Sequence, residues 1–383
     1  MATDDLYSPL PAFHLASVAI RSFRGLVKLT VPFSRRLTVL VGENGAGKTS
    51  VLDAIHAGLA PKLAGGGRVA PSDRTREASE GVEILLTLSD GQTWGRSEHD
   101  FLGDLQLTRM PAYASFPADR RFSEERAFAR LSGWLRGLDV EEALTIRERQ
   151  DLGYRHPKLE AVRRAVASLI PGAANLRAAT NALTVDHAVG EHRMAGFPVS
   201  QLSGGVRMML MVVADIAQRL LERHGDDGLT GPGLVLIDEV DLHLHPRWQL
   251  SVVDALLETF PGVQFIVTTH SEEIFATVPS ACIVSLRATD EGVVAERPPD
   301  LRGARFDEAL QDGMGLGFGR PPAAQGELDA YHAMIRDGLG ETDEARAARA
   351  ALRDRWPGLE LELVRADFEL RRRRLDARRA TGS

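Results

Sequence analysis

The sequence predicts an α/β fold with a helical insertion and a helical C-terminal extension. Three observations predict it. Strand-like segments near the N-terminus lead into a glycine-rich loop and then into a segment with helical spacing. Continuous apolar runs typical of buried parallel strands return at 234–240 and 263–270. Apolar and charged residues recur at helical intervals after residue 119 and again after residue 293.

The composition predicts a globular cytoplasmic protein with no membrane segment. Apolar residues make up 44% and charged residues 26% of the 383 residues, which suffices for a substantial core. The single cysteine, Cys282, forms no internal disulfide, as suits a reducing compartment. The N-terminus lacks a signal-peptide pattern, and no apolar run reaches the roughly 18 residues of a membrane span. A net charge of −7 argues against a generally nucleic-acid-coating surface but leaves room for a local basic patch.

The first part of the core is expected over residues 1–118. "LASVAI", "LVKLTVPF" and "RLTVLV" have strand patterns, and "KTSVLDAIHAGLA" has helical spacing. "VEILLTLSDGQTWGRSE" predicts a hairpin that turns at Asp90-Gly91, and "MPAYASF" predicts a strand that ends at Pro117.

The rest of the chain divides by character into three expected parts. Residues 119–200 form a helical insertion subdomain, because charged amphipathic segments such as "PKLEAVRRAVASLI" fill most of it. Residues 201–292 hold the second part of the core. Residues 293–383 form a C-terminal helical region for partner binding or oligomerisation.

The C-terminal tail leaves two interpretations open. Its spacing places Leu361, Val364, Phe368 and Leu375 on one helical face, and Arg371–Arg374 with Arg378 and Arg379 form a basic cluster. This pattern is typical of a solvated helix end. It is also compatible with a docking surface for a partner protein or a nucleic-acid backbone.

"VGENGAGKTS" has the pattern of a phosphate-binding loop, G-x-x-x-x-G-K-[ST], with a strand before it and a helix after it. Glycines let consecutive N–H groups point inward as an anion nest at the helix N-terminus. Lys48 is expected to act on β- and γ-phosphate oxygens, and the Thr49 hydroxyl is expected to ligate Mg²⁺. An unrelated glycine turn is the alternative. The predicted ATP-binding residues are Asn44, Gly45, Ala46, Gly47, Lys48, Thr49 and Ser50.

Two further segments supply groups for phosphoryl transfer. "LVLIDE" is an apolar strand that ends in Asp238, expected at the Mg²⁺, and Glu239, expected to be the general base. Alone, this pattern could be a solvated strand end. His270 ends the second apolar strand; such a histidine is more often structural, but here it can contact the γ-phosphate. His243 and His245 suggest a metal site, but no third ligand is evident.

"LSGG" precedes a predicted helix and offers a second anion-binding turn. Ser203 contributes a hydroxyl, and Gly204 and Gly205 contribute N–H groups at the helix N-terminus. An isolated "LSGG" would be an ordinary helix cap. Its place between the phosphate loop and "LVLIDE" favours a nucleotide-binding role instead.

The four motifs in this order resemble the ABC-type ATPases: Walker A (42–49), signature (202–205), Walker B (234–239) and switch histidine (270). The resemblance implies a P-loop NTPase fold of ABC type, with a mixed sheet flanked by helices and an antiparallel β subdomain. It also implies a head-to-tail homodimer or higher oligomer, in which the signature of one subunit closes over ATP held by another.

"DEVDLHLHPRWQ" and "QFIVTTHSEEI" resemble the soluble SMC-, RecF- and OLD-like branch, and nearly the whole chain resembles the PtuA-like ATPases of Septu and of some retron anti-phage systems. This implies an ATP-hydrolysing switch that controls a separate effector, expected to be a nuclease. Two departures stand out: no Q-loop glutamine is evident near "YASFPADR", and the segment after Glu239 is not a transporter D-loop. A RecF- or SMC-like DNA-repair ATPase and a non-hydrolysing ATP-dependent scaffold remain alternatives.

Overall fold

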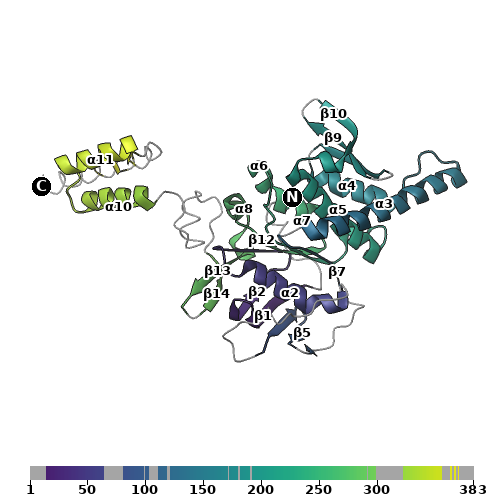
Figure 1. Ribbon diagram of the computed structural model, residues 1–383, viewed down its shortest axis with the longest axis horizontal. Helices are drawn as coiled ribbons and strands as arrows, with labels where there is room; N and C mark the ends of the chain where they lie inside the picture. The colour runs from purple at the N-terminus through teal and green to yellow at the C-terminus, as the bar shows by residue number, and fades with distance from the viewer. Residues whose placement is uncertain are drawn as a thin grey trace, which may run out of the picture. The chain divides into compact units, whose positions relative to one another are not determined.

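The computed structural model contains two compact units, residues 1–316 and 317–383 (Figure 1). It describes residues 14–63, 81–98, 100–102, 111–118, 121–170, 172–179, 182–189, 192–290, 292–298, 322–355, 363–364, 366–367 and 370.

A six-stranded mixed sheet forms the centre of the first unit. Its strand order is β14-β13-β3-β12-β11-β7. Five strands run parallel, and only β14 pairs antiparallel, with β13. This confirms the predicted mixed sheet. The strands are β3 (Leu37–Gly42), β7 (Ala112–Phe116), β11 (Gly233–Ile237), β12 (Val263–Thr268), β13 (Ile283–Thr289) and β14 (Gly292–Glu296).

Both faces of the central sheet are buried, which explains the continuous apolar strands. Successive side chains of a strand point to opposite faces. On β12, Phe265 and Val267 therefore join the core beneath the helices, whereas Ile266 joins the core on the other face.

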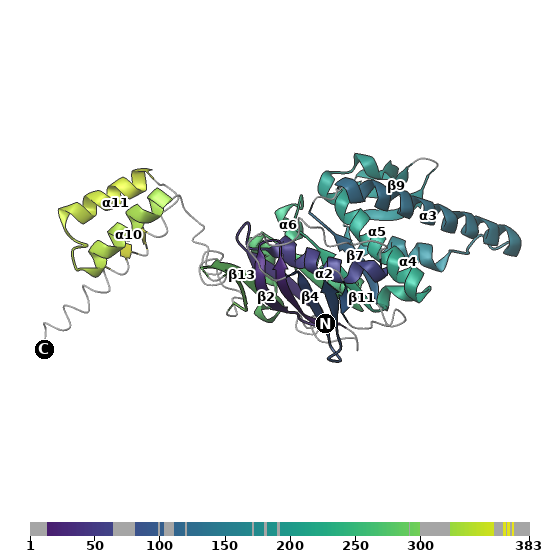
Figure 2. The ribbon, with the colours of Figure 1, turned by 60° about the horizontal axis from the view of Figure 1, so that its bottom comes forward.

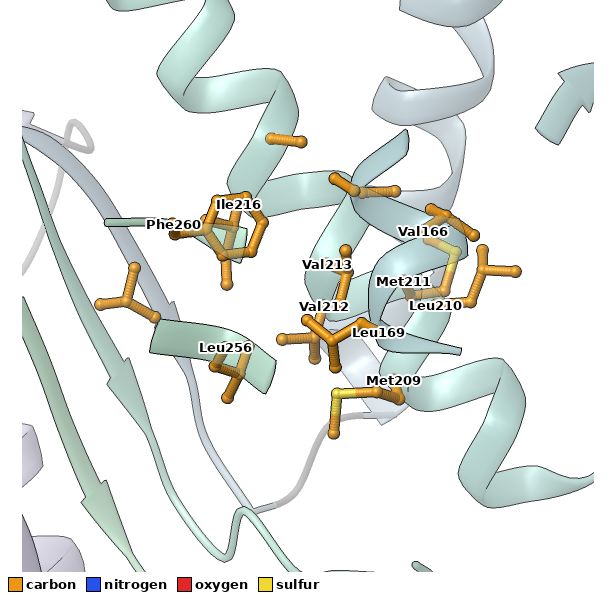
Figure 3. Packing of buried hydrophobic residues seen from close by; sticks show 14 of the residues in the cluster. Val166, Leu169, Met209, Leu210, Met211, Val212, Val213, Ile216, Leu256 and Phe260 are labelled. Carbon is orange, nitrogen blue, oxygen red and sulfur yellow. The ribbon is translucent and has the colours of Figure 1, made fainter. Parts of the chain in front are cut away.

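Four helices supply most of the helical residues in the core on the first face: α3 (Arg121–Arg149), α4 (Pro157–Leu169), α5 (Gly204–His224) and α7 (Val252–Thr259). Helix α5 contacts α3, α4 and β7. In Figure 3, Val213 and Ile216 of α5 lie in one apolar cluster with Leu169 of α4 and Leu256 of α7. Helix α5, which begins at the signature residues 202–205, is thus packed against the other helices through apolar contacts.

A buried carboxylate also joins α3 and α5. Asp215 is 2% exposed and pairs with Arg130 of α3 and with Arg219 one turn along α5. Arg219 also donates a hydrogen bond from Nη1 to the carbonyl oxygen of Tyr113 on β7, at 3.1 Å. A charge this deeply buried requires such partners.

The second face carries α2 (Lys48–Leu63), which lies between the central sheet and an antiparallel sheet of order β2-β1-β4-β5-β6 (Figure 2). Val51, Leu52 and Ile55 are all buried, as expected for a helix covered on both sides. Gly91, at φ +81°, lies in the β4–β5 turn, which confirms the predicted hairpin. The antiparallel strands are β1 (Leu15–Phe23), β2 (Leu26–Pro32), β4 (Glu83–Leu88), β5 (Thr93–Ser97) and β6 (Phe101–Leu102).

The prediction of a helical insertion is wrong for residues 173–178, 183–189 and 192–198. These residues form an antiparallel sheet of order β10-β9-β8: β8 (Ala173–Ala178), β9 (Leu183–Val189) and β10 (His192–Pro198). Leu183 and Val185 point into the helical core at strand spacing. Register shifts in both strand pairings break the alternation that would have revealed the strands.

The predicted end of the core at residue 292 is also wrong, because β14 continues the central sheet to Glu296. Short helices and turns complete this unit: α6 (Pro246–Gln249), α8 (Glu272–Thr277) and 3₁₀ turns at Val199–Gln201, Gly228–Thr230 and Ser280–Cys282.

The second unit is helical in its described part. Helices α10 (Pro322–Arg336) and α11 (Asp343–Arg355) share a small core that includes Tyr331, Leu352 and Leu363. Val364, one residue of the predicted apolar face, is 38% exposed. The neighbouring Leu363 is buried instead. The remaining residues of the predicted face and the arginine cluster lie outside the described residues: Leu361, Phe368, Leu375, Arg371–Arg374, Arg378 and Arg379.

None of the helices in the described ranges is both long enough and apolar enough to span a membrane.

Candidate nucleotide-binding site

The glycine-rich loop joins the end of β3 to the start of α2. Gly42, Gly45 and Gly47 have φ values of +147°, +84° and +93°, which disfavour other residues. A Cβ atom at position 42 would lie 2.3 Å from the carbonyl oxygen of Leu286, and one at position 47 would lie 2.7 Å from Leu26 Cδ2. Both backbone conformation and close packing therefore require glycine in this loop.

Lys48 lies across the loop that precedes it. Its Nζ donates hydrogen bonds to the carbonyl oxygens of Gly42 and Glu43, at 2.8 and 3.0 Å, and the residue is 7% exposed. Burial lowers the pKa of Lys48, while the nearby carboxylates of Asp238, Glu239 and Asp241 act in the opposite direction. A buried ammonium group among carboxylates is a suitable partner for a phosphate anion.

Asp238 and Glu239 follow β11 and are held by threonines from two other elements. Thr49 Oγ1 donates to Asp238 Oδ2 at 2.9 Å, and Thr268 Oγ1 donates to Asp238 Oδ1. The same Thr268 oxygen accepts the backbone N–H of Glu239 at 2.8 Å. Glu239 has a φ of +49°, an uncommon conformation for this residue type.

These elements line one pocket of about 200 Å³. Most of the predicted binding and catalytic residues lie there together, including His270, which follows β12 by two residues. The pocket residues are Asn44, Gly45, Gly47, Lys48, Thr49, Ser50, Asp238, Glu239 and His270.

Ala46, the remaining predicted residue of the loop, has its side chain in the apolar core. It is 3% exposed in the core around α2, and its backbone N–H donates to the carbonyl oxygen of Glu43 at 3.2 Å. Ala46 therefore does not line the pocket.

The signature turn lies outside this pocket. Ser203 is the exposed N-cap of α5, and its side chain makes no capping hydrogen bond within the described structure. Gly204 is exposed, whereas Gly205 is buried: a Cβ there would lie 2.2 Å from the carbonyl oxygen of His243. One chain thus brings the Walker A, Walker B and switch residues together without the signature.

The donor set of the pocket fits a nucleotide with Mg²⁺. The hydroxyl of Thr49 and the carboxylate of Asp238 are hard oxygen donors, the type that Mg²⁺ prefers. The glycine loop and Lys48 provide N–H groups and positive charge for phosphates. Among the residues that the structure describes, no group of three or more His, Cys, Asp and Glu could hold a metal ion, so a site at His243 and His245 gains no support.

Thr268 is the main site residue that sequence reasoning missed. Two threonines stand directly before the switch histidine in "VTTH", and their position at the end of a buried strand was the available signal.

Family comparisons cover most of the first unit. Residues 17–100 match the family described as "AAA domain", and residues 101–276 match the family described as "AAA domain, putative AbiEii toxin, Type IV TA system". Among solved structures, the SmcHead bound to the C-winged helix domain of ScpA aligns with a TM-score of 0.45 at 16% identity. That alignment covers 76% of this chain and 99% of the other.

Two curated relatives are similar at 33% identity. One, named Retron Ec83 probable ATPase, from Escherichia coli, aligns over 219 residues, 56% of this chain and 39% of that protein. The Septu protein PtuA of Bacillus thuringiensis aligns over 133 residues, 32% of this chain and 33% of that protein. The alignments thus span well under half of each relative. Over these segments the chain is therefore related to the retron ATPases and to the Septu proteins PtuA.

Proposed function

We propose that this chain binds and hydrolyses ATP in the pocket between the glycine loop, Asp238 and His270. One observation carries the proposal: the Thr49 hydroxyl contacts the Asp238 carboxylate at 2.9 Å, in a pocket that Lys48 and Glu239 also line. Cation, metal donors and a candidate base thus lie together, as phosphoryl transfer requires.

Each residue has a distinct proposed role. The loop N–H groups and Lys48 bind the phosphates, and Thr49 and Asp238 hold Mg²⁺, which when bound neutralises charge on phosphate oxygens. Glu239 accepts a proton from the attacking water, and His270 contacts the γ-phosphate.

We further propose that the active form is a head-to-tail dimer, or a higher oligomer built from such pairs. The exposed Ser203 and Gly204, which do not line their own chain's pocket, support this arrangement. In it, each signature turn closes over ATP held by the other chain, as the resemblance to ABC-type ATPases implies. ATP between two chains then stabilises the dimer by linkage.

The similarity to retron Ec83 ATPase and to Septu PtuA supports a role in bacterial anti-phage defence. There, the nucleotide state of the dimer would control a separate effector protein, for which we propose a nuclease.

Replacement of the candidate base tests hydrolysis. Glu239→Gln keeps the phosphate loop but removes the proton acceptor, so ATP should bind normally while turnover falls by about 10²–10⁴-fold. Lys48→Ala should instead abolish ATP binding. Phosphate release and equilibrium ATP binding should be measured on purified full-length chains. Unchanged turnover in Glu239→Gln would contradict the proposed base.

A further inference from the structure

Two hydrogen-bonded links flank the switch histidine. On one side of His270, the Thr269 hydroxyl donates to the Asp241 carboxylate. On the other side, Ser271 Oγ donates to Gln249 Oε1 at 3.0 Å. Asp241 and Gln249 both belong to the segment that follows Glu239, so the two links tie His270 to the chain that carries the candidate base.

Gln249 uses both ends of its amide in this arrangement. It is the last residue of α6, and its Nε2 donates to the carbonyl oxygens of Asp241 and Leu244, at 3.3 and 3.1 Å. Its Oε1 accepts from Ser271. One neutral side chain therefore joins the turn after Glu239 to the residue after His270.

Ser271 is fixed from its other side as well. Its hydroxyl oxygen accepts the Ile274 N–H at 3.2 Å as the N-cap of α8, and its backbone N–H donates to Thr269 Oγ1 at 2.8 Å. Two acceptors, Gln249 Oε1 and Glu273 Oε2, share the single proton of the Ser271 hydroxyl, each at 3.0 Å from Oγ. The capping bonds fix α8 to its own start, whereas the bond to Gln249 fixes that start to the turn after Glu239.

We propose that Gln249 is a positioning residue for phosphoryl transfer, which holds His270 in place relative to Glu239. The inference rests on the proposed function, because it assigns a role within the same site. Only an amide can both donate to the two carbonyl oxygens and accept from Ser271. Leucine at position 249 would lose all these hydrogen bonds, and glutamate would place a carboxylate oxygen against the two carbonyl oxygens. Small misplacement of a reacting or γ-phosphate-contacting group has large kinetic effects.

A double-mutant cycle tests this role. Gln249→Leu should lower kcat by about 10- to 100-fold, with little change in KM for ATP, because the phosphate loop is untouched. In a His270→Ala background, Gln249→Leu should cause no further loss, since it acts through the histidine. An equal loss of kcat in both backgrounds, or no loss in either, would overturn the proposal.

Gln218→Leu is the matched control. Gln218 is a buried glutamine of α5 whose Nε2 donates to Glu222 Oε1 at 2.7 Å, and it does not line the pocket. This variant should leave kcat unchanged. A loss equal to that of Gln249→Leu would show that removing any hydrogen-bonded glutamine amide lowers kcat, and would overturn the positioning role.

A second measurement does not depend on turnover. The imidazole signal of His270, assigned by its absence in His270→Ala, should shift or broaden in the NMR spectrum of nucleotide-free Gln249→Leu. An unchanged signal would overturn the proposal. Should wild-type turnover survive Glu239→Gln, the proposed base is wrong, and this spectrum still decides the role of Gln249.

Discussion

At the scale of single residues, Thr268 connects the two carboxylates of the site. Its hydroxyl donates to Asp238 and accepts the N–H of Glu239, which has a positive φ. A non-glycine residue in this conformation costs about 1 kcal/mol or more, so surrounding contacts must maintain it. Thr268 thus helps set the direction in which Glu239 leaves the strand.

Thr268→Val removes the hydroxyl while keeping the side-chain shape. Because the Glu239 N–H and one Asp238 oxygen lose their partner, the free energy of unfolding should fall by roughly 1–3 kcal/mol. We expect turnover to fall about tenfold or more through misplacement of Glu239. Urea unfolding and phosphate release measure the two effects.

Thr259→Val is the control for this substitution. Within the described residues, the buried Thr259 hydroxyl has no hydrogen-bond partner. Its removal should therefore leave stability unchanged or raise it by up to about 1 kcal/mol, with normal turnover. Equal effects of the two substitutions would contradict the role given to Thr268.

The sequence predicted those site residues that belong to short, contiguous motifs. Asn44, Lys48, Thr49, Asp238, Glu239 and His270 all line the pocket. Thr268 and Gln249 escaped notice because their partners lie far away in sequence: Thr268 reaches Asp238 across 30 positions and Gln249 reaches Ser271 across 22. No short pattern encodes such contacts.

At the scale of elements, the start of α5 packs directly on the turn after Glu239. A Cβ on Gly205 would lie 2.2 Å from the His243 carbonyl oxygen, and His243 itself has a φ of +63°. The turn therefore contacts both the start of α5 and, through Asp241 and Thr269, the segment that follows β12 and carries His270. Sequence placed the signature before a helix but gave no sign of this contact.

Adjacent glycines offer a matched test of that packing. Gly205→Ala should lower the free energy of unfolding by about 1–3 kcal/mol, because backbone must move to admit the methyl group. Gly204→Ala should be neutral or stabilising, since nothing lies within 4 Å of its Cβ position. Thermal unfolding of both variants measures this difference in stability. Similar melting temperatures would contradict the close contact.

Element prediction succeeded where one periodicity ran unbroken. The apolar strands β11 and β12 are buried on both faces, and α4 shows a clear apolar stripe. The sheet of β8 to β10 was missed because its strands are interrupted by register shifts and its edge strand β10 is largely exposed. Neither feature leaves the alternation on which strand prediction depends.

At the scale of the whole molecule, the proposed pairing concerns a signature turn that lies apart from its own chain's nucleotide pocket. Each chain places its phosphate loop, Asp238 and His270 in one pocket and leaves Ser203 exposed elsewhere. The local motifs predicted the phosphate loop, Asp238, His270 and Ser203 as site residues. The pairing of two chains, and the proposed link to defence and to an effector, came from family resemblance. One chain's sequence does not encode the position of a second chain.

ATP-dependent assembly tests the central claim most directly. Light scattering with ATP and Mg²⁺ should give twice the monomer mass, or a higher multiple, for Glu239→Gln, which retains bound ATP. Adding Ser203→Arg should restore the monomer mass while ATP still binds, because the arginine blocks only the surface that closes over the partner's nucleotide. Assemblies that persist with Ser203→Arg, or Glu239→Gln chains that stay monomeric at saturating ATP, would contradict the composite site.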